Sequence, residues 1–242
     1  MTSSYEIKQN FIKKKIKSIF NYFGLEIKRK NSFLERYSEH IAEANSNDLN
    51  LIKKTQEISL ASKSNLWSII QSIKFIKDNN IEGDFVECGV FRGGTLALIC
   101  TYIQFLNLDC KIFGYDTFED GFLKDQLSEF DIDFKGKEIN SEKFINPKNF
   151  YYNKNQVYNL IKNFNIKEKY LPTLIKGDIT KTLLIDDNLP KKISFLRLDT
   201  DIYITTKIQL EILYPRLTKN GILHIDDYGI CPGVKRAVDD FF

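Results

Sequence analysis

Two short apolar runs near the C-terminal end of the chain, each followed at once by carboxylates, constrain the fold more than any other feature. Residues 193–198 read ISFLRL and residues 221–225 read GILHI, and an apolar stripe of helical period runs through residues 205–217 between them. The acids are Asp199 and Asp201 after the first run and Asp226 and Asp227 after the second. Two parallel strands joined by a crossover helix would bring all four acids to the carboxyl edge of one sheet, where open α/β sheets bind ligands.

This group of acids has two interpretations. Single exposed aspartates usually do no more than keep a loop in water, and each of the four taken alone is explained in that way. Packing gives no reason for four carboxylates to converge on one edge. We therefore expect a functional site there.

Length and charge limit the classes of protein that the chain can belong to. The 242 residues, 43% of them hydrophobic, suit one core of α/β size with appendages. The net charge of +3 is small, and much of the lysine excess lies in residues 1–30, so we expect no nucleic-acid partner.

Cysteine usage and hydropathy predict a cytoplasmic protein. The four cysteines have no C-x-x-C spacing and no neighbouring histidine, which favours reduced thiols over a zinc site or a disulfide scaffold. No apolar run is long enough to span a membrane, and the charged N-terminus has no cleavable signal pattern.

The N-terminal region reads as an appendage. Residues 5–30 combine apolar residues at helical spacing with many lysines, which predicts a basic amphipathic helix. Such a helix either makes peripheral contact with an anionic membrane surface or an acidic partner, or packs on its own domain or across a homo-oligomer. Polar residues 45–50 are typical of a linker or exposed turn, so we expect an extension over residues 1–60 and the main domain over residues 61–242.

A glycine-rich turn after a short strand indicates a second part of the site. Residues 84–88 read DFVEC and are followed by GVFRGG at 89–94 and by an apolar helical stretch over 95–105. This order places free backbone N–H groups and a helix N-terminus beside a ligand. The glycine spacing departs from G-x-G-x-x-G, so a pyrophosphate is not the best fit, whereas Glu87 suits a ligand with a cationic amino acid portion, such as S-adenosylmethionine.

Two further acids predict contacts with an adenosine ligand. The strand predicted at 111–115 ends in Asp116, where a carboxylate can accept both hydroxyl protons of a ribose diol. Asp178 follows the strand predicted at 173–176 and would meet the adenine amino group. Methyltransferases and dehydrogenases share this arrangement, so it supports adenosine without choosing the reaction.

The segment between these two strands is longer than a crossover requires. We expect residues 118–150 to form a lid over the acceptor, with a surface insertion as the alternative, and the regular crossover helix to begin near residue 155. A second core-facing helix is predicted over residues 64–78, with Ser64 as its N-cap.

Taken together, the motifs resemble one family. EGDFVECGVFRGG, FGYDTFEDGF, KGD, LRLDTD-Y and HIDDYG occur in this order from residue 81 onwards and are similar to those of the macrocin O-methyltransferase family, whose members methylate sugar hydroxyls on antibiotics and related glycosides. The resemblance implies an α/β Rossmann-like class I methyltransferase fold, with helices on both faces of a mostly parallel sheet. It also implies S-adenosylmethionine, a bound Mg²⁺ and a carboxylate base.

The resemblance also implies roles for particular residues. Asp199, Asp226 and Asp227 would bind the metal, and Asp201 would be the catalytic base. The implied cofactor-binding residues are Glu87, Gly89, Phe91, Gly93, Thr95, Asp116, Thr117, Asp178 and Asp199. Thr200 departs from the family, which commonly has glycine there. A complete class I sheet also ends in an antiparallel strand hairpin that has no counterpart before Phe242, which predicts a truncated chain or a partner that covers the sheet edge.

The chemistry follows from the residue types. A sugar hydroxyl is a poor acid, and a cation on oxygen ligands would bind both oxygens of a vicinal diol and lower the pKa of one of them. Oxygen-only ligands suit magnesium, calcium or manganese rather than zinc. Asp201 would then accept the proton. His224 is expected to be a hydrogen-bonded core histidine, and Tyr203 and Tyr228 are candidates for the acceptor pocket.

The leading hypothesis is therefore a Mg²⁺- and S-adenosylmethionine-dependent O-methyltransferase that acts on a small-molecule or glycan hydroxyl. One alternative is a nucleotide-dependent, sugar-modifying Rossmann enzyme with no need for magnesium. A second alternative is a non-catalytic scaffold that binds a membrane surface or a partner through its basic N-terminal helix.

Overall fold

The computed structural model describes residues 41–118, 126–132, 136–137 and 151–242. The chain divides into two compact units, Met1–Ala42 and Glu43–Phe242, and the second of these carries the fold discussed below. The basic helix expected at residues 5–30 lies outside the described residues, as does most of the predicted lid.

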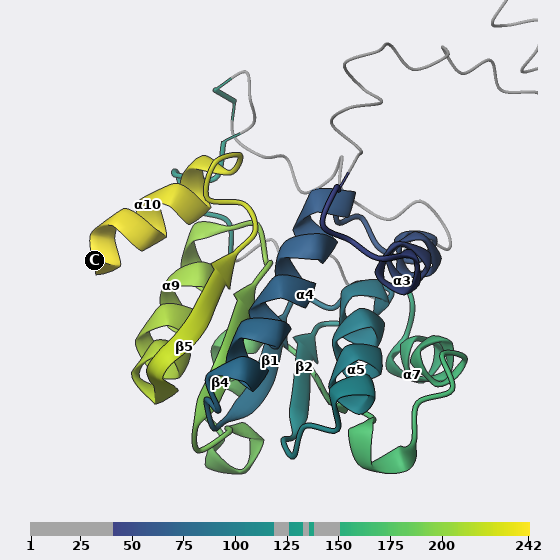
Figure 1. Cartoon of the computed structure of the whole chain (residues 1–242). Helices are drawn as coiled ribbons and strands as arrows, with labels where there is room; N and C mark the ends of the chain where they lie inside the picture. The colour runs from purple at the N-terminus through teal and green to yellow at the C-terminus, as the bar shows by residue number, and fades with distance from the viewer. Residues whose placement is uncertain (1–40, 119–125, 133–135, 138–150) are drawn as a thin grey trace, which may run out of the picture. The chain divides into compact units, whose positions relative to one another are not determined.

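Within the described residues, five strands form one parallel sheet (Figure 1). They are β1 (Asp84–Cys88), β2 (Ile112–Asp116), β3 (Thr173–Lys176), β4 (Ile193–Leu198) and β5 (Leu217–Ile225). Their order is β3-β2-β1-β4-β5, and every neighbouring pair is parallel. From β1 the chain adds β2 and β3 on one side, and β4 and β5 follow on the other side. The carboxyl ends of β1 and β4 therefore flank the switch point at which such sheets bind ligands.

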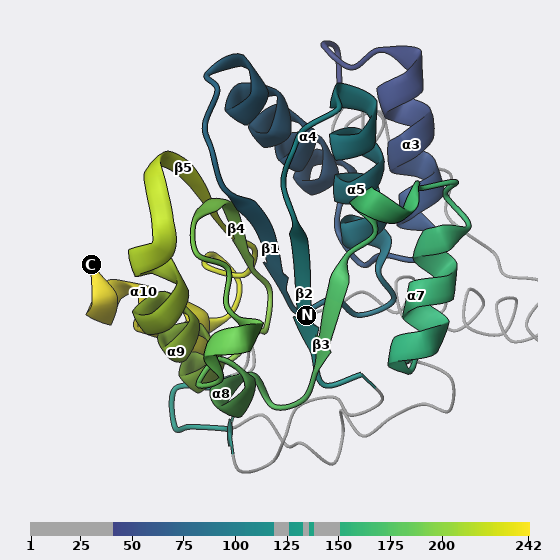
Figure 2. The same cartoon turned by 90° about the horizontal axis from the view of Figure 1, so that it is seen from below.

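Helices cover both faces of the sheet, as the sequence predicted (Figure 2). They are α3 (Ser46–Gln56), α4 (Lys63–Asp78), α5 (Gly94–Leu106), α7 (Lys154–Lys162), α8 (Ile179–Thr182), α9 (Tyr203–Leu213) and α10 (Pro232–Phe241). α4 and α5 lie on one face, and α8, α9 and α10 lie on the other (Figure 2). In the part of the chain that the structure describes, no helix combines the length and apolarity needed to cross a bilayer.

The sheet is buried most deeply at its centre. All six residues of β4 are buried, which explains why its sequence is almost continuously apolar rather than alternating. On one face, Val86 and Leu196 pack against Leu210 and Leu213 of α9 and Val234 of α10. β5 lies at the edge of the sheet and is only partly buried.

The N-terminal boundary of this unit differs from the prediction. The polar residues expected to form a turn at 45–50 instead begin α3, because the Asn45 side chain accepts a hydrogen bond from Asp48 N and caps the helix. Ile52 is fully buried in this helix. Next along the chain, α4 is capped by Ser62 rather than by Ser64.

The crossover helix between β4 and β5 also differs from the prediction. It begins at Tyr203, two residues earlier than expected, and ends at Leu213, after which a 3-10 turn leads into a β5 that starts at Leu217. Its buried side includes Thr205, Thr206 and Gln209 beside its leucines. The expected apolar stripe packs on the core through Ile208, Ile212 and Leu213, so the buried polar residues are an addition that the stripe did not predict.

Candidate active site at the carboxyl edge of β1, β4 and β5

The turn after β1 packs directly on the end of β4. Gly89 has a φ of 90°, and a Cβ at this position would lie 1.8 Å from the carbonyl oxygen of Asp199. Gly93, with a φ of 85°, precedes α5, and its added Cβ would lie 2.9 Å from Val157 of α7. Both glycines thus stand where left-handed backbone and close approach exclude a side chain.

Asp116 organises this turn from the tip of β2. Its Oδ2 accepts hydrogen bonds from Val90 N at 2.7 Å and Phe91 N at 2.9 Å, and its Oδ1 accepts one from Phe118 N at 2.8 Å. Burial raises the pKa of Asp116, and these backbone donors oppose the shift. The expectation that the amides of the turn are free for a ligand is therefore wrong for Val90 and Phe91. The ribose role of Asp116, and those of Thr117 and Thr95, stay predictions.

A buried arginine joins the first strand to the acid cluster. Glu87 and Arg197 occupy paired positions on β1 and β4, each side chain is 1% exposed, and Arg197 Nη1 lies 3.1 Å from Glu87 Oε1. Burial raises the pKa of Glu87 to about 8, against the attraction of Arg197. Among the described residues, none donates a hydrogen bond to Glu87 Oε2.

The acids after β4 and β5 converge as the sequence predicted. Single oxygens of Asp199, Asp226 and Asp227 lie within 4.8 Å of one another, an arrangement that could hold a metal ion. Arg197 binds Asp199 through Nη1 and lies 3.3 Å from Asp226 Oδ1 through Nη2. Burial raises the pKa of Asp199 to about 7, and burial together with the hydrogen bond that the protonated Asp227 donates to Asp201 raises the pKa of Asp227 to about 8.

Asp201 lies beside this group. Its carboxyl group is hydrogen-bonded to that of Asp227, and burial raises its pKa. Its backbone φ is +63°, in the left-handed region. Oxygens of Asp201 and Asp227 also group with the Cys231 thiol within 4.8 Å.

Sequence reasoning missed two residues of this site. The sequence signal for Arg197 was that it is the lone charged residue in an otherwise apolar strand. Asn65 of α4 donates a hydrogen bond to Asp226 Oδ1, and no local pattern marks it. From the same helix, Ser68 Oγ lies 3.1 Å from His224 Nε2, which confirms the hydrogen-bonded histidine. Burial lowers the pKa of His224 to about 4.

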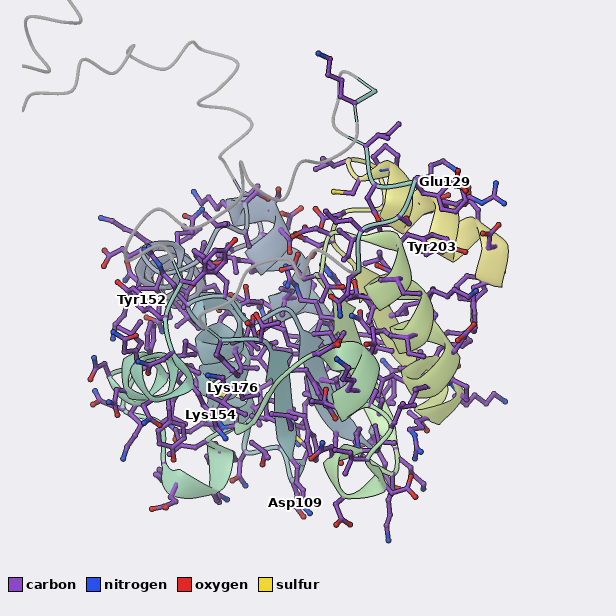
Figure 3. All side chains as sticks on the ribbon, turned by 180° about the vertical axis from the view of Figure 1, so that it is seen from behind. Asp109, Glu129, Tyr152, Lys154, Lys176 and Tyr203 are labelled. Carbon is purple, nitrogen blue, oxygen red and sulfur yellow. The ribbon has the colours of Figure 1, made fainter. Side chains whose placement is uncertain are left out.

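Three other predicted residues form hydrogen bonds with groups outside the acid cluster. Asp178 caps α8, where its Oδ1 accepts Thr180 N at 2.9 Å, and its adenine role stays a prediction. The hydroxyl groups of Tyr203 and Tyr228 donate to Asp240 and Asp239 of α10, at 3.2 and 2.8 Å. Figure 3 shows Tyr203 beside this helix. Both hydroxyl groups are thus engaged by α10, and the acceptor-pocket role of the two tyrosines stays a prediction.

This strand order, with a glycine turn after the first strand and acids after the fourth and fifth, defines a Rossmann-like fold of the class I methyltransferase type. The family model described as macrocin-O-methyltransferase (TylF) matches residues 8–242, and the chain belongs to this family.

Individual relatives agree with this assignment. The chain is 29% identical over 187 residues to demethyldecarbamoylnovobiocin O-methyltransferase of Streptomyces niveus, an alignment that covers 73% of this chain and 64% of that relative. The structure of the O-methyltransferase NovP matches with 25% identity and a TM-score of 0.65 over 76% of this chain and 73% of its own. CalS11, a calicheamicin methyltransferase, shares the fold at 17% identity, with a TM-score of 0.54 over 89% of this chain and 90% of its own.

Proposed function

We propose that this protein transfers a methyl group from S-adenosylmethionine to a hydroxyl group of a sugar or glycoside, with Mg²⁺ bound beside the acceptor. The observation that carries the proposal is the convergence of Asp199, Asp201, Asp226 and Asp227 next to the glycine turn. Membership of the macrocin-O-methyltransferase family supports the reaction, and the activity of the Streptomyces relative, a demethyldecarbamoylnovobiocin O-methyltransferase, supports a glycoside-like acceptor.

The residues around the glycine turn fit S-adenosylmethionine. Glu87 Oε2 is buried and has no donor among the described residues, and the ammonium group of the cofactor would satisfy it. Gly89 carries no side chain, so the backbone of the turn after β1 can lie directly against the backbone at the end of β4. A nucleotide-dependent Rossmann enzyme is less well supported, because Val90 N and Phe91 N donate to Asp116 and would not cradle a pyrophosphate.

The acid cluster fits a hard divalent cation. Its three metal-ligand candidates offer only carboxylate oxygens, which Mg²⁺ prefers. Burial raises the pKa values of Asp199 and Asp227, and the neighbouring charge of Asp226 adds to both shifts, so a bound cation would favour the ionised forms of these carboxylates.

The chain's own groups then account for the remaining steps. Mg²⁺, when bound, supplies a Lewis acid that makes the acceptor hydroxyl more acidic. Arg197 positions Asp199 and Asp226 through ion pairs, and Asn65 orients Asp226 through a hydrogen bond. Asp201 accepts the hydroxyl proton as the new carbon–oxygen bond forms. The positioning of acceptor and donor in line supplies the rest of the rate enhancement.

Calorimetric titration tests the proposal directly. The full chain is titrated with S-adenosylmethionine and, separately, with NAD⁺, each with Mg²⁺ and with EDTA. We expect binding of S-adenosylmethionine and methylation of glycoside acceptors that stops in EDTA. Tight binding of NAD⁺ alone would contradict the methyltransferase, and methylation that survives chelation would contradict the metal role.

A further inference from the structure

The backbone at Asp201 adopts an uncommon conformation. Its φ of +63° comes with a hydrogen bond from Ile202 N to Thr200 O at 2.8 Å, which closes a three-residue γ-turn around it. γ-turns with a positive central φ are rare and strained. Such conformations are costly and persist only where the surrounding structure enforces them.

Buried polar side chains surround this turn from the side of α9. Thr200 Oγ1 lies 2.7 Å from Thr205 Oγ1 and accepts a hydrogen bond from Gln209 Nε2 at 2.9 Å. Thr205 Oγ1 also lies 3.1 Å from Ile202 O, on the other side of Asp201. Thr205 is 4% exposed and Gln209 is fully buried. These polar residues lie on the buried side of α9, and they bind both neighbours of Asp201.

Asp131, from a distant part of the chain, binds the residue that directly follows this turn. Its Oδ1 accepts a hydrogen bond from Tyr203 N at 2.8 Å, and its Oδ2 accepts Ser128 N at 2.8 Å and Ser128 Oγ at 2.7 Å. Asp131 is 2% exposed. The residue before α9, Ile202, provides no side-chain cap, so Asp131 caps this helix from the segment after β2.

A glycine of α10 packs against the Asp131 carboxylate. A Cβ at Gly233, in the first turn of α10, would lie 2.0 Å from Asp131 Oδ1. Gly233 has no positive φ that would require glycine, so the close approach of Asp131 explains its identity. Next to Asp131, the Phe130 ring packs on Tyr203 at 4.8 Å and under Arg236 at 5.4 Å, which fixes the segment between α9 and α10.

We propose that Asp131, with Thr200, Thr205 and Gln209, forms a polar brace that holds Asp201 in its strained turn, and that Asp131 is thereby a positioning residue for the base. The inference rests on the proposed function only for the role of Asp201. The brace itself is a statement about the Asp201 backbone, and it connects the segment after β2 to the acid cluster.

Gly233→Ala tests the brace without replacing any of its polar side chains. The added methyl group competes with Asp131 Oδ1 for space, although alanine is the better residue inside a helix. Gly229→Ala is the matched control, because no described atom lies within 4 Å of its added Cβ. We expect kcat to fall about 10- to 100-fold in Gly233→Ala, with an unchanged Kd for S-adenosylmethionine, and to stay at the wild-type value in the control. A wild-type kcat in Gly233→Ala would overturn the proposal.

The Thr205 hydroxyl group offers a second, conservative pair. Thr205→Ser keeps the hydrogen bonds to Thr200 and Ile202 and should retain kcat, whereas Thr205→Val keeps the shape and should lose it to a similar degree as Gly233→Ala. Equal kcat values in the two variants would contradict the brace.

Crystal structures of the wild type and of Asp131→Ala separate this inference from the proposed function. The wild type should show Asp201 with positive φ, and Asp131→Ala should show it relaxed to negative φ. If the wild type methylates no acceptor, the proposed function fails while this comparison still decides the brace. An unchanged left-handed Asp201 in Asp131→Ala would overturn the inference whatever the activity.

Discussion

At the scale of single residues, Arg197 holds the site together. One fully buried guanidinium contacts the carboxylates of Glu87 in β1, Asp199 directly after β4 and Asp226 directly after β5. Its own pKa is raised by these acids despite burial. A buried ion pair need not stabilise a fold relative to apolar residues, but removal of one partner leaves the others buried without compensation.

Arg197→Met should therefore be strongly destabilising. We expect the free energy of unfolding to fall by about 3–5 kcal/mol, because three carboxylates lose their common partner. Urea denaturation of the variant in EDTA measures this loss. Lys192→Met is the control, since Lys192 pairs with Glu82 at 3.8 Å on the surface and should cost less than about 1 kcal/mol. Equal effects of the two substitutions would contradict the central role of Arg197.

Asp201→Asn separates proton transfer from binding. The amide keeps the size of the side chain but cannot accept the hydroxyl proton, so kcat should fall about 100- to 10,000-fold. Calorimetry should give unchanged Kd values for Mg²⁺ and S-adenosylmethionine. Asp187→Asn, on an exposed 3-10 turn, should leave all three quantities unchanged. Full turnover in Asp201→Asn would remove Asp201 from the reaction.

At the scale of elements, the strands were predictable and α3 was not. β1 and β4 were predicted with their observed bounds, because central parallel strands are short apolar runs bounded by turn and charged residues. The start of α3 is polar and locally resembles a turn. Packing on the rest of the unit decides its conformation. The backbone of α5 at Gly94 lies so close to α3 that a Cβ added there would be 2.7 Å from Thr55 O.

If α3 belongs to the core, truncation of its buried face should be costly. Ile52 is fully buried, so Ile52→Ala should lower the free energy of unfolding by about 2–5 kcal/mol. Leu60→Ala, at a position 74% exposed, should change it by less than about 0.5 kcal/mol. Urea denaturation compares the two variants. A loss of less than about 0.5 kcal/mol in Ile52→Ala would contradict the assignment of α3 to the core.

At the scale of the whole molecule, the location of the candidate site was predictable and its support was not. The carboxylates that end β4 and β5 are local signals, and the topology of a parallel sheet brings them together. Asn65 and Asp131 reach the same site from α4 and from the segment after β2. Their contacts span long stretches of sequence and follow no period, so only the folded chain reveals them.

The charge of the assembled site should make stability depend on pH and on a cation. The pKa values of Glu87 and Asp227 are raised to about 8 and that of Asp199 to about 7, whereas in the unfolded chain all three ionise near pH 4. Between about pH 6.5 and about pH 8 the folded protein therefore binds more protons than the unfolded chain, and stability in EDTA should fall as the pH rises. His224, with its pKa lowered to about 4, is neutral in the folded protein throughout this range.

Mg²⁺ should reverse this trend, because it binds the ionised carboxylates that protons otherwise occupy. At about 100 times its Kd it adds about 2.7 kcal/mol, and the gain measured by urea denaturation should be larger near pH 8 than near pH 6.5, where protons compete. Asp226→Ala should lose the response to Mg²⁺ at both pH values because a ligand is missing. A gain independent of pH, or one that persists in Asp226→Ala, would mean that the cation stabilises the fold from somewhere other than the carboxyl edge of β4 and β5.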